Sequence, residues 1–237
     1  MYFRLMNDNL SNKNSKPLRR VRSFVKRVGR MTQFQKKAIE NYWNKFGINF
    51  TESYLNFNQL FGNDNPVILE IGFGMGDSLV QMAKKHPDTN YIGIEVHTPG
   101  VGNILANINQ LELKNIRIVE YDAIDVLQKM IFNNTLSGVQ IFFPDPWHKT
   151  RHHKRRLIQR EFLELVSTKI MKAGFIHVAT DWAHYAEQII LLLEESSYFN
   201  NKFEGYAPRP DSRPLTKFEK RGERLKHGVW DIYFQRI

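Results

Sequence analysis

The chain has 237 residues, 42% of them hydrophobic, which is enough to bury one full core. It contains no cysteine, which excludes disulfide bonds, thiolate zinc sites and cysteine nucleophiles. No apolar run approaches the roughly 20 residues of a membrane span, and the first residues lack the apolar core of a signal peptide, so we expect a cytoplasmic protein.

The net charge of +10 is concentrated in two segments. Residues 1–40 lack apolar periodicity and are predicted to form a flexible basic arm, with ten basic residues and no acidic one between Asp8 and Glu40. A second acid-free segment, from His148 to Arg160, carries six more basic residues. The rest of the chain is acidic overall, so the two segments indicate a polyanionic partner, most simply a nucleic acid.

Residues 41–237 are predicted to form a single α/β domain with a doubly wound, mostly parallel sheet. Residues 39–61 are rich in aromatic side chains and are expected to pack on the core as a helix and a turn. From residue 67 onward, β-branched and aromatic runs alternate with helical stretches. The expected strands are 67–71, 91–96, 116–120, 139–143, 175–180 and an antiparallel 229–236, and the expected helices lie near 77–86, 99–113, 123–132, 157–172 and 182–196.

A glycine-rich loop follows the first of these strands. Gly72, Gly74 and Gly76 allow the backbone to turn sharply and to approach a ligand with no Cβ in the way. The spacing is G-x-G-x-G, and Asp77 stands where a dinucleotide fingerprint needs its last glycine. Because its carboxylate would repel a pyrophosphate, the loop favours S-adenosylmethionine, which has no phosphate, over NAD.

Acidic residues stand at the carboxyl ends of the expected strands, where ligands bind in such sheets. Glu95 is predicted to accept hydrogen bonds from the ribose hydroxyls of the methyl donor, and Asp122 from its adenine amine. Glu70, beneath the glycine loop, either lies near the cationic part of the donor or bonds loop N–H groups. Asp77 and Asp122 are also candidate helix N-caps.

The segment Pro144-Asp-Pro-Trp147 is expected to face the methyl group of the donor. Its two prolines make it rigid, and Trp147 offers a surface for a flipped base. The next residues form a basic lip, and their expected partners are RNA phosphates: Lys149, Arg151, Lys154, Arg155 and Arg156. We expect no metal at the histidines between them, because the surrounding cations would repel one.

From about residue 22 to residue 236 the sequence resembles the bacterial tRNA (guanine-N7-)-methyltransferase family. The matching motifs are Arg22-Ser-Phe-Val-Lys-Arg-Val-Gly-Arg30, Glu70-Ile-Gly-Phe-Gly-Met-Gly76, Gly93-Ile-Glu-Val-His97, Phe143-Pro-Asp-Pro-Trp147, Ala179-Thr-Asp-Trp182 and Arg209-Pro-x-Ser-Arg-Pro-x-Thr-Lys-Phe-Glu219.

This resemblance implies a seven-stranded, Rossmann-like methyltransferase sheet and transfer of a methyl group from S-adenosylmethionine to a guanine N7 in the variable loop of tRNA. It implies cofactor contacts at Glu70, Glu95, Asp122 and Asp145, and a catalytic role for Asp145. It also implies substrate contacts at Lys149, Asp181, Thr216, Lys217, Phe218 and Glu219.

Guanine N7 carries an unshared electron pair at neutral pH, so no proton has to leave before it attacks the methyl group. Catalysis then consists mainly of alignment and of carboxylates that offset the cationic product. We interpret Asp145 as a grip on the N1–H and N2 amine of guanine, with electrostatic stabilisation as the alternative.

Three other functions fit the residues less well. An exocyclic-amine methyltransferase usually has a second proline where this chain has Asp145-Pro-Trp147, and an NAD-dependent oxidoreductase is disfavoured by Asp77. A non-catalytic RNA-binding protein on the same fold is disfavoured by the intact glycine loop and carboxylates. A monomer is the working expectation, but the sequence decides neither the oligomeric state nor the tRNAs that are accepted.

Overall fold

The computed structural model describes residues 23–24, 30–211, 213–215, 219 and 228–237. Most of the predicted basic arm, together with Thr216, Lys217 and Phe218, therefore lies outside the described residues. Helix α1 (Gln33–Phe46) begins before the expected start at residue 39. The cause is a capping box, in which Thr32 and Gln35 each accept a hydrogen bond from the backbone N–H of the other.

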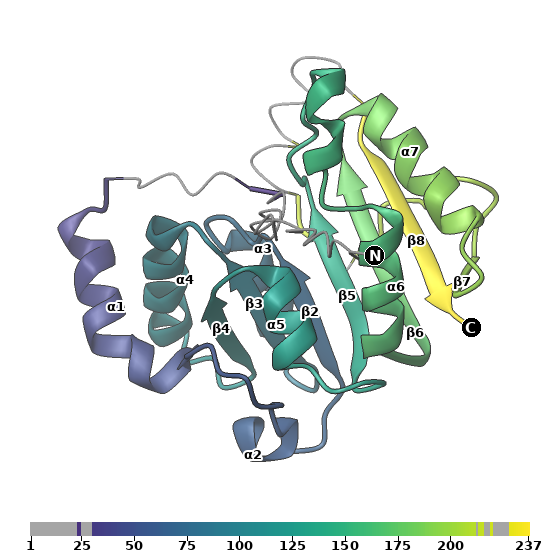
Figure 1. Cartoon of the computed structure of the whole chain (residues 1–237). Coiled ribbons are helices and arrows are strands. Elements are labelled where there is room, and N and C mark those ends of the chain that lie inside the picture. The colour runs from purple at the N-terminus through teal and green to yellow at the C-terminus, as the bar shows by residue number, and fades with distance from the viewer. Residues whose placement is uncertain (1–22, 25–29, 212, 216–218, 220–227) are drawn as a thin grey trace, which may run out of the picture.

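One sheet lies at the centre of the molecule (Figure 1), and within the described residues it has eight strands in the order β1-β4-β3-β2-β5-β6-β8-β7. Strands β1 to β6 pair in parallel, and β8 pairs antiparallel with β6 and β7. The bounds are β1 Gly47–Ile48, β2 Val67–Ile71, β3 Asn90–Glu95, β4 Ile116–Glu120, β5 Leu136–Phe142, β6 Ile170–Thr180, β7 Phe199–Asn201 and β8 Trp230–Arg236.

The predicted doubly wound, mostly parallel sheet and its antiparallel last strand are confirmed. The count of seven is one too low, because the two-residue strand β1 pairs with the outer edge of β4. Neither β1 nor the three-residue β7 was among the expected strands, since runs this short show no alternating pattern.

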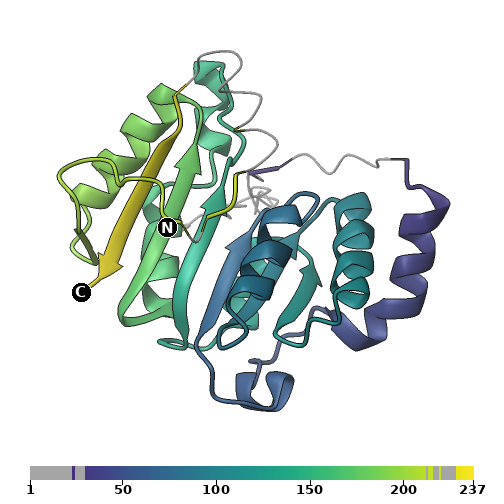
Figure 2. The same cartoon turned by 180° about the vertical axis from the view of Figure 1, so that it is seen from behind.

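Helices cover both faces of the sheet (Figures 1 and 2). One face carries α3 (Asp77–Lys85) and α4 (Thr98–Gln110), with α1 packed on α4. The other carries α5 (Ala123–Lys129), α6 (Arg160–Lys169) and α7 (Ala183–Glu194). A short helix, α2 (Phe57–Phe61), precedes β2, and the 3₁₀ helix η1 (Thr150–Arg155) follows β5.

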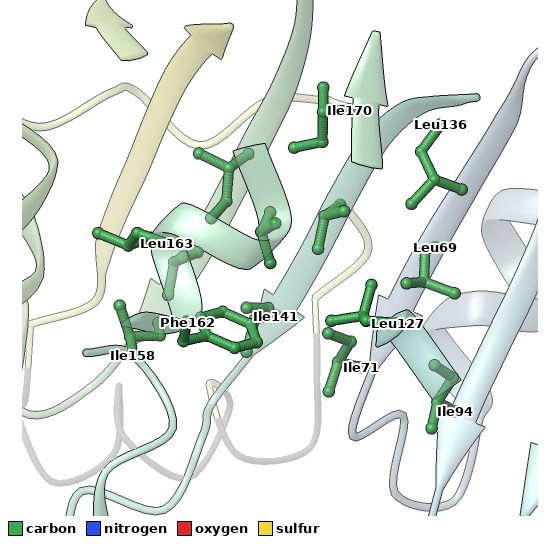
Figure 3. Packing of buried hydrophobic residues seen from close by; sticks show 14 of the residues in the cluster. Leu69, Ile71, Ile94, Leu127, Leu136, Ile141, Ile158, Phe162, Leu163 and Ile170 are labelled. Atoms are coloured by element: carbon green, nitrogen blue, oxygen red, sulfur yellow. The ribbon is translucent and has the colours of Figure 1, made fainter. Parts of the chain in front are cut away.

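Aliphatic side chains of the strands form the core. On the face of α5 and α6, Ile71 and Ile141 from neighbouring strands pack with Leu127, Phe162 and other helix residues (Figure 3). Burial on both faces explains the nearly continuous apolar runs of the central strands. Among the described residues, no helix is both long enough and apolar enough to cross a membrane.

Candidate active site

The glycine loop leaves β2 in a conformation that only glycine adopts easily. Gly72 and Gly74 have φ values of +77° and +60°, and a Cβ built on either would meet no atom of the described residues within 4 Å apart from its chain neighbours. The amide of Gly72 donates to the carbonyl of Ile94 at 2.8 Å, which ties the start of the loop to β3. The loop is therefore a cradle whose ligand side is open.

Glu95 ends β3 beside this loop, as predicted, and its carboxylate fixes the loop in place. Oε2 accepts from the amide of Gly74 at 2.8 Å, while Oε1 accepts from the amides of Val96 at 2.6 Å and His97 at 3.0 Å. Because Glu95 also lines the cavity next to the loop, it joins the backbone of the cradle to the space where a ligand would lie.

Glu70 is a buried carboxyl group beneath the loop. Its Oε2 has no hydrogen-bond partner among the described residues, and the pKa of the group is raised to about 8 by burial and then by the charge of Glu95. Gln140, its direct neighbour on β5, also has a buried side-chain oxygen without a partner. An unpartnered carboxyl at this position fits a cationic ligand group better than it fits an acid that bonds the loop.

Of the two residues predicted as helix N-caps, one caps its helix and the other does not. Asp122 caps α5, since its Oδ1 accepts from the amide of Ile124 at 2.9 Å. Asp77 is the first residue of α3, and the cap position belongs to Gly76 at a φ of 81°, so the predicted cap role of Asp77 is wrong. Asp122 is partly buried next to Tyr121 and Ala123, which line the cavity.

Two adjoining cavities lie over the carboxyl ends of the strands. The first has a volume of about 210 Å³, and none of the described residues that line it is basic. The second has about 740 Å³ and includes Lys149 in its wall. The two share the lining residues Phe24, Glu95, Val96 and Asp145. Asp145 therefore lies at the boundary between the first cavity, whose described lining residues include no basic side chain, and the second cavity, whose wall contains Lys149.

The turn that carries Asp145 is strained at both ends. Phe143 and Trp147 have φ values of 53° and 48°, which is unusual for bulky residues. The amide of Phe143 donates to the carbonyl of Ala179 at 2.7 Å, and Arg156 Nε donates to the carbonyl of Pro146 at 2.8 Å. The turn is held by neighbouring elements as well as by its two prolines.

Arg156 belongs to the protein interior. It is only 2% exposed, its guanidinium lies 4.6 Å from the ring centre of Tyr185, and it bonds Pro146, His153, His184 and Gln188. The structure gives it these partners in place of the predicted RNA phosphate. Lys149, Arg151 and Lys154 are exposed, as phosphate contacts need to be.

Trp147 is also engaged by the protein. Its Nε1 donates to the carbonyl of Ser23 at 3.1 Å, and the guanidinium of Arg155 lies 4.3 Å from its ring centre. Arg155 is partly buried, and its guanidinium covers one face of the indole that is predicted to stack with a base. Ser23 and Phe24 line the first cavity, and sequence reasoning missed them although they belong to a recognised motif.

Glu219 lies in a buried ionic cluster. Both of its oxygens accept from Arg213, at 2.7 and 2.8 Å, and Arg213 also bonds both oxygens of Asp231, each at 2.8 Å. Burial would raise the pKa of Asp231, but hydrogen bonds from His177 and Arg213 outweigh it and lower the pKa. Glu219 thus has a structural partner in place of the predicted substrate contact.

Arg213 and Glu219 of this cluster belong to the chain between β7 and β8, and the described part of that chain passes in front of the sheet in Figure 2. The guanidinium of Arg213 lies 5.9 Å from the ring centres of Phe142 and Phe143, directly before the Asp145 turn. Asp181, half-buried, follows β6 at the same edge of the sheet. In the part of the chain that the structure describes, no group of three or more histidines and carboxylates could hold a metal ion.

Comparisons with known proteins agree with this geometry. A family model described as "Putative methyltransferase" matches residues 64–232. The tRNA (guanine-N(7)-)-methyltransferase of Salmonella typhimurium strain LT2 is 54% identical over 226 residues, covering 94% of this chain and 95% of that protein. The protein of the same name from Mannheimia succiniciproducens is 53% identical over 218 residues, covering 91% and 88%.

Two solved structures resemble the fold. The 16S rRNA methyltransferase KamB has a TM-score of 0.57 at 13% identity and covers 78% of this chain and 94% of its own. The aminoglycoside resistance methyltransferase NpmB1 has a TM-score of 0.55 at 16% identity and covers 76% and 92%. At these identities the likeness concerns the fold alone.

Proposed function

This chain belongs to the tRNA (guanine-N(7)-)-methyltransferase family, and we propose that its two cavities divide the reaction between methyl donor and acceptor guanine. The enzyme transfers a methyl group from S-adenosylmethionine to N7 of a guanine in tRNA. We place the target in the variable loop of tRNA and the reaction in the cytoplasm.

The 210 Å³ cavity suits the methyl donor. When bound, S-adenosylmethionine supplies an electrophilic methyl group on a positively charged sulfur. Gly72 and Gly74 offer an open cradle, and Glu95 is positioned to accept from ribose hydroxyls while it holds the loop. Glu70 supplies a buried carboxyl beneath the loop, and Asp122 stands near the adenine end. Asp77 in the first turn of α3 disfavours a dinucleotide, whose pyrophosphate would lie at this helix N-terminus and meet the carboxylate.

The 740 Å³ cavity suits the guanine. Asp145 is exposed and can accept from the N1–H and N2 amine, which turns N7 toward the donor. No general base is required, because N7 already carries its electron pair. The residues of the turn therefore work by orientation and by placing negative charge next to a cationic product.

The single observation that carries this division is the place of Asp145, which lines both cavities. A carboxylate at the boundary can touch the acceptor base and face the reacting methyl group. A non-catalytic RNA-binding protein would have no need for the open glycine cradle or for the unpartnered Glu70.

The test is to incubate the protein with bulk tRNA and methyl-labelled donor and then to map the product. We expect label at N7 of a variable-loop guanine, which makes the strand cleavable by aniline after reduction. Asp145→Ala serves as the inactive control. Label on an exocyclic amine, or tRNA binding with no methyl transfer, would overturn the proposal.

A further inference from the structure

An exposed pair of aromatic rings lies next to the acceptor cavity. The rings of His148 and Trp182 have centroids 4.2 Å apart and planes tilted by 31°. His148 follows the Asp145 turn and lines the 740 Å³ cavity, whereas Trp182 lies between β6 and α7. Two loops far apart in the sequence thus bring one aromatic surface to the edge of the site.

A structural role does not account for Trp182. The residue is 36% exposed, so about a third of its surface gains nothing from burial. It occupies the N-cap position of α7, where serine, threonine, aspartate or asparagine would cap the helix, and it makes no side-chain cap hydrogen bond. Packing and capping would both be served by smaller residues.

The surroundings of the pair match a single-stranded nucleic acid. Lys149, in the next position after His148, lines the same cavity and is exposed, as are Arg151 and Lys154 on η1. Exposed aromatic rings beside basic side chains are the usual combination in proteins that bind unpaired bases. Trp147 carries the guanidinium of the partly buried Arg155 on its ring, whereas the ring that lies against Trp182 is the exposed His148.

We propose that His148 and Trp182 form a stacking platform for a nucleotide adjacent to the target guanine; this inference rests on the proposed function. Turning a guanine into the site removes the stacking that its neighbour had in the RNA, and an indole face replaces it. Stacking uses the face of the base and not its edge, so the platform tolerates any base at the neighbouring position.

The first test compares Trp182→Ala, Trp182→Leu and Trp182→Phe with Phe132→Ala. Phe132 is 56% exposed and follows α5, so it is a control for loss of an exposed aromatic ring. We expect alanine to raise the KM for tRNA about tenfold or more, leucine nearly as much, and phenylalanine less than threefold. The Kd for the methyl donor and the Tm should stay at the wild-type values, as should all readings for Phe132→Ala.

The second test uses tRNA with an abasic nucleotide on either side of the target guanine. With the wild-type enzyme, one of the two substrates should show a raised KM, and Trp182→Ala should be insensitive to that same change. An unchanged KM in Trp182→Ala, or equal sensitivity of both enzymes to the abasic substrates, would overturn the platform. A wild-type enzyme that fails to methylate tRNA at all would instead overturn the proposed function.

Discussion

Arg156 Nε donates a hydrogen bond to the carbonyl oxygen of Pro146 at 2.8 Å, and this bond joins the end of η1 to the turn that carries Asp145. The other guanidinium nitrogens bond His153, His184 and Gln188, so the group is fixed on every side. A buried arginine with this many partners sets the position of a backbone segment.

Arg156→Lys should lower kcat by tenfold or more, because an ammonium group cannot reproduce the planar set of donors. The salt dependence of tRNA binding should not change, since the side chain does not reach solvent. Steady-state kinetics and binding isotherms at several salt concentrations measure both quantities. Gln188→Ala, which removes one partner only, should give a smaller loss of kcat. Arg156→Gln, which removes the charge, should also keep the wild-type salt slope, and a reduced slope in that variant would return this residue to the phosphate contacts.

The salt dependence of tRNA binding should instead depend on the exposed residues Lys149, Arg151 and Lys154. Replacing each with alanine should reduce the slope of log affinity against log salt by about 1, because one fewer counterion is released. Lys172→Ala, a change at an exposed position in the first part of β6, is the matched control and should leave the slope alone. If the triple variant keeps the wild-type slope, the basic segment is only a solvated face.

Glu95→Ala should weaken donor binding by about 2 to 3 kcal/mol, or roughly 30- to 150-fold, through loss of charge-assisted hydrogen bonds. The structure adds a second cause, since Gly74 would lose the acceptor of its amide. Isothermal titration calorimetry with the donor measures the affinity. The tRNA affinity without donor is the control and should stay unchanged, and a wild-type donor affinity in the variant would contradict the assignment.

Glu70 predicts a pH dependence of stability. Its pKa is about 8 in the folded protein against 4.5 for the ordinary group, so between these values the folded state binds a proton that the unfolded state has released. The stability from Glu70 is therefore present below pH 4.5 and is lost as pH rises toward 8. Glu70→Gln should have a Tm near that of the wild type at pH 5 and a higher Tm at pH 8, where the free energy of unfolding of the wild type has fallen by an amount on the order of a few kcal/mol.

The measurement is the Tm of the wild type and of Glu70→Gln across this pH range, without donor. Because the other titrating groups are common to both proteins, the difference between the two curves reports on Glu70. A constant difference across the pH range would show that Glu70 is ionised in the folded state throughout.

Asp145→Asn should lower turnover strongly, because the amide presents a donor to a donor on the guanine. Inosine lacks the N2 amine, so the same substitution should cost less with inosine at the target position. The cycle of protein and base changes should show a coupling on the order of 1 kcal/mol or more. Additive effects would indicate that Asp145 acts on the developing charge and does not touch the amine.

Local sequence patterns alone determined most of the strands and the position of the glycine loop in this enzyme. The strands were visible because each is a short run of β-branched side chains buried on both faces, and Gly72, Gly74 and Glu95 could be placed because strand ends and glycine loops have strong local signatures. The basic segment after β5 was equally plain from composition. These features depend on residues within one strand–helix–strand unit.

Only the tertiary structure decided which residue of a given type serves which purpose. Arg156 and Lys154 are two residues apart in one basic run, yet one is buried against α7 and the other is exposed, because the run curls into a 3₁₀ helix with one side on the protein. An ionic cluster joins β8 to the chain that precedes it, through Arg213, Glu219 and Asp231. No local sequence pattern predicts such a contact. Trp147 and Trp182 follow neighbouring strands, and only the tertiary structure sets a partly buried arginine, Arg155, against the first and an exposed ring, His148, against the second, since burial depends on contacts between distant segments.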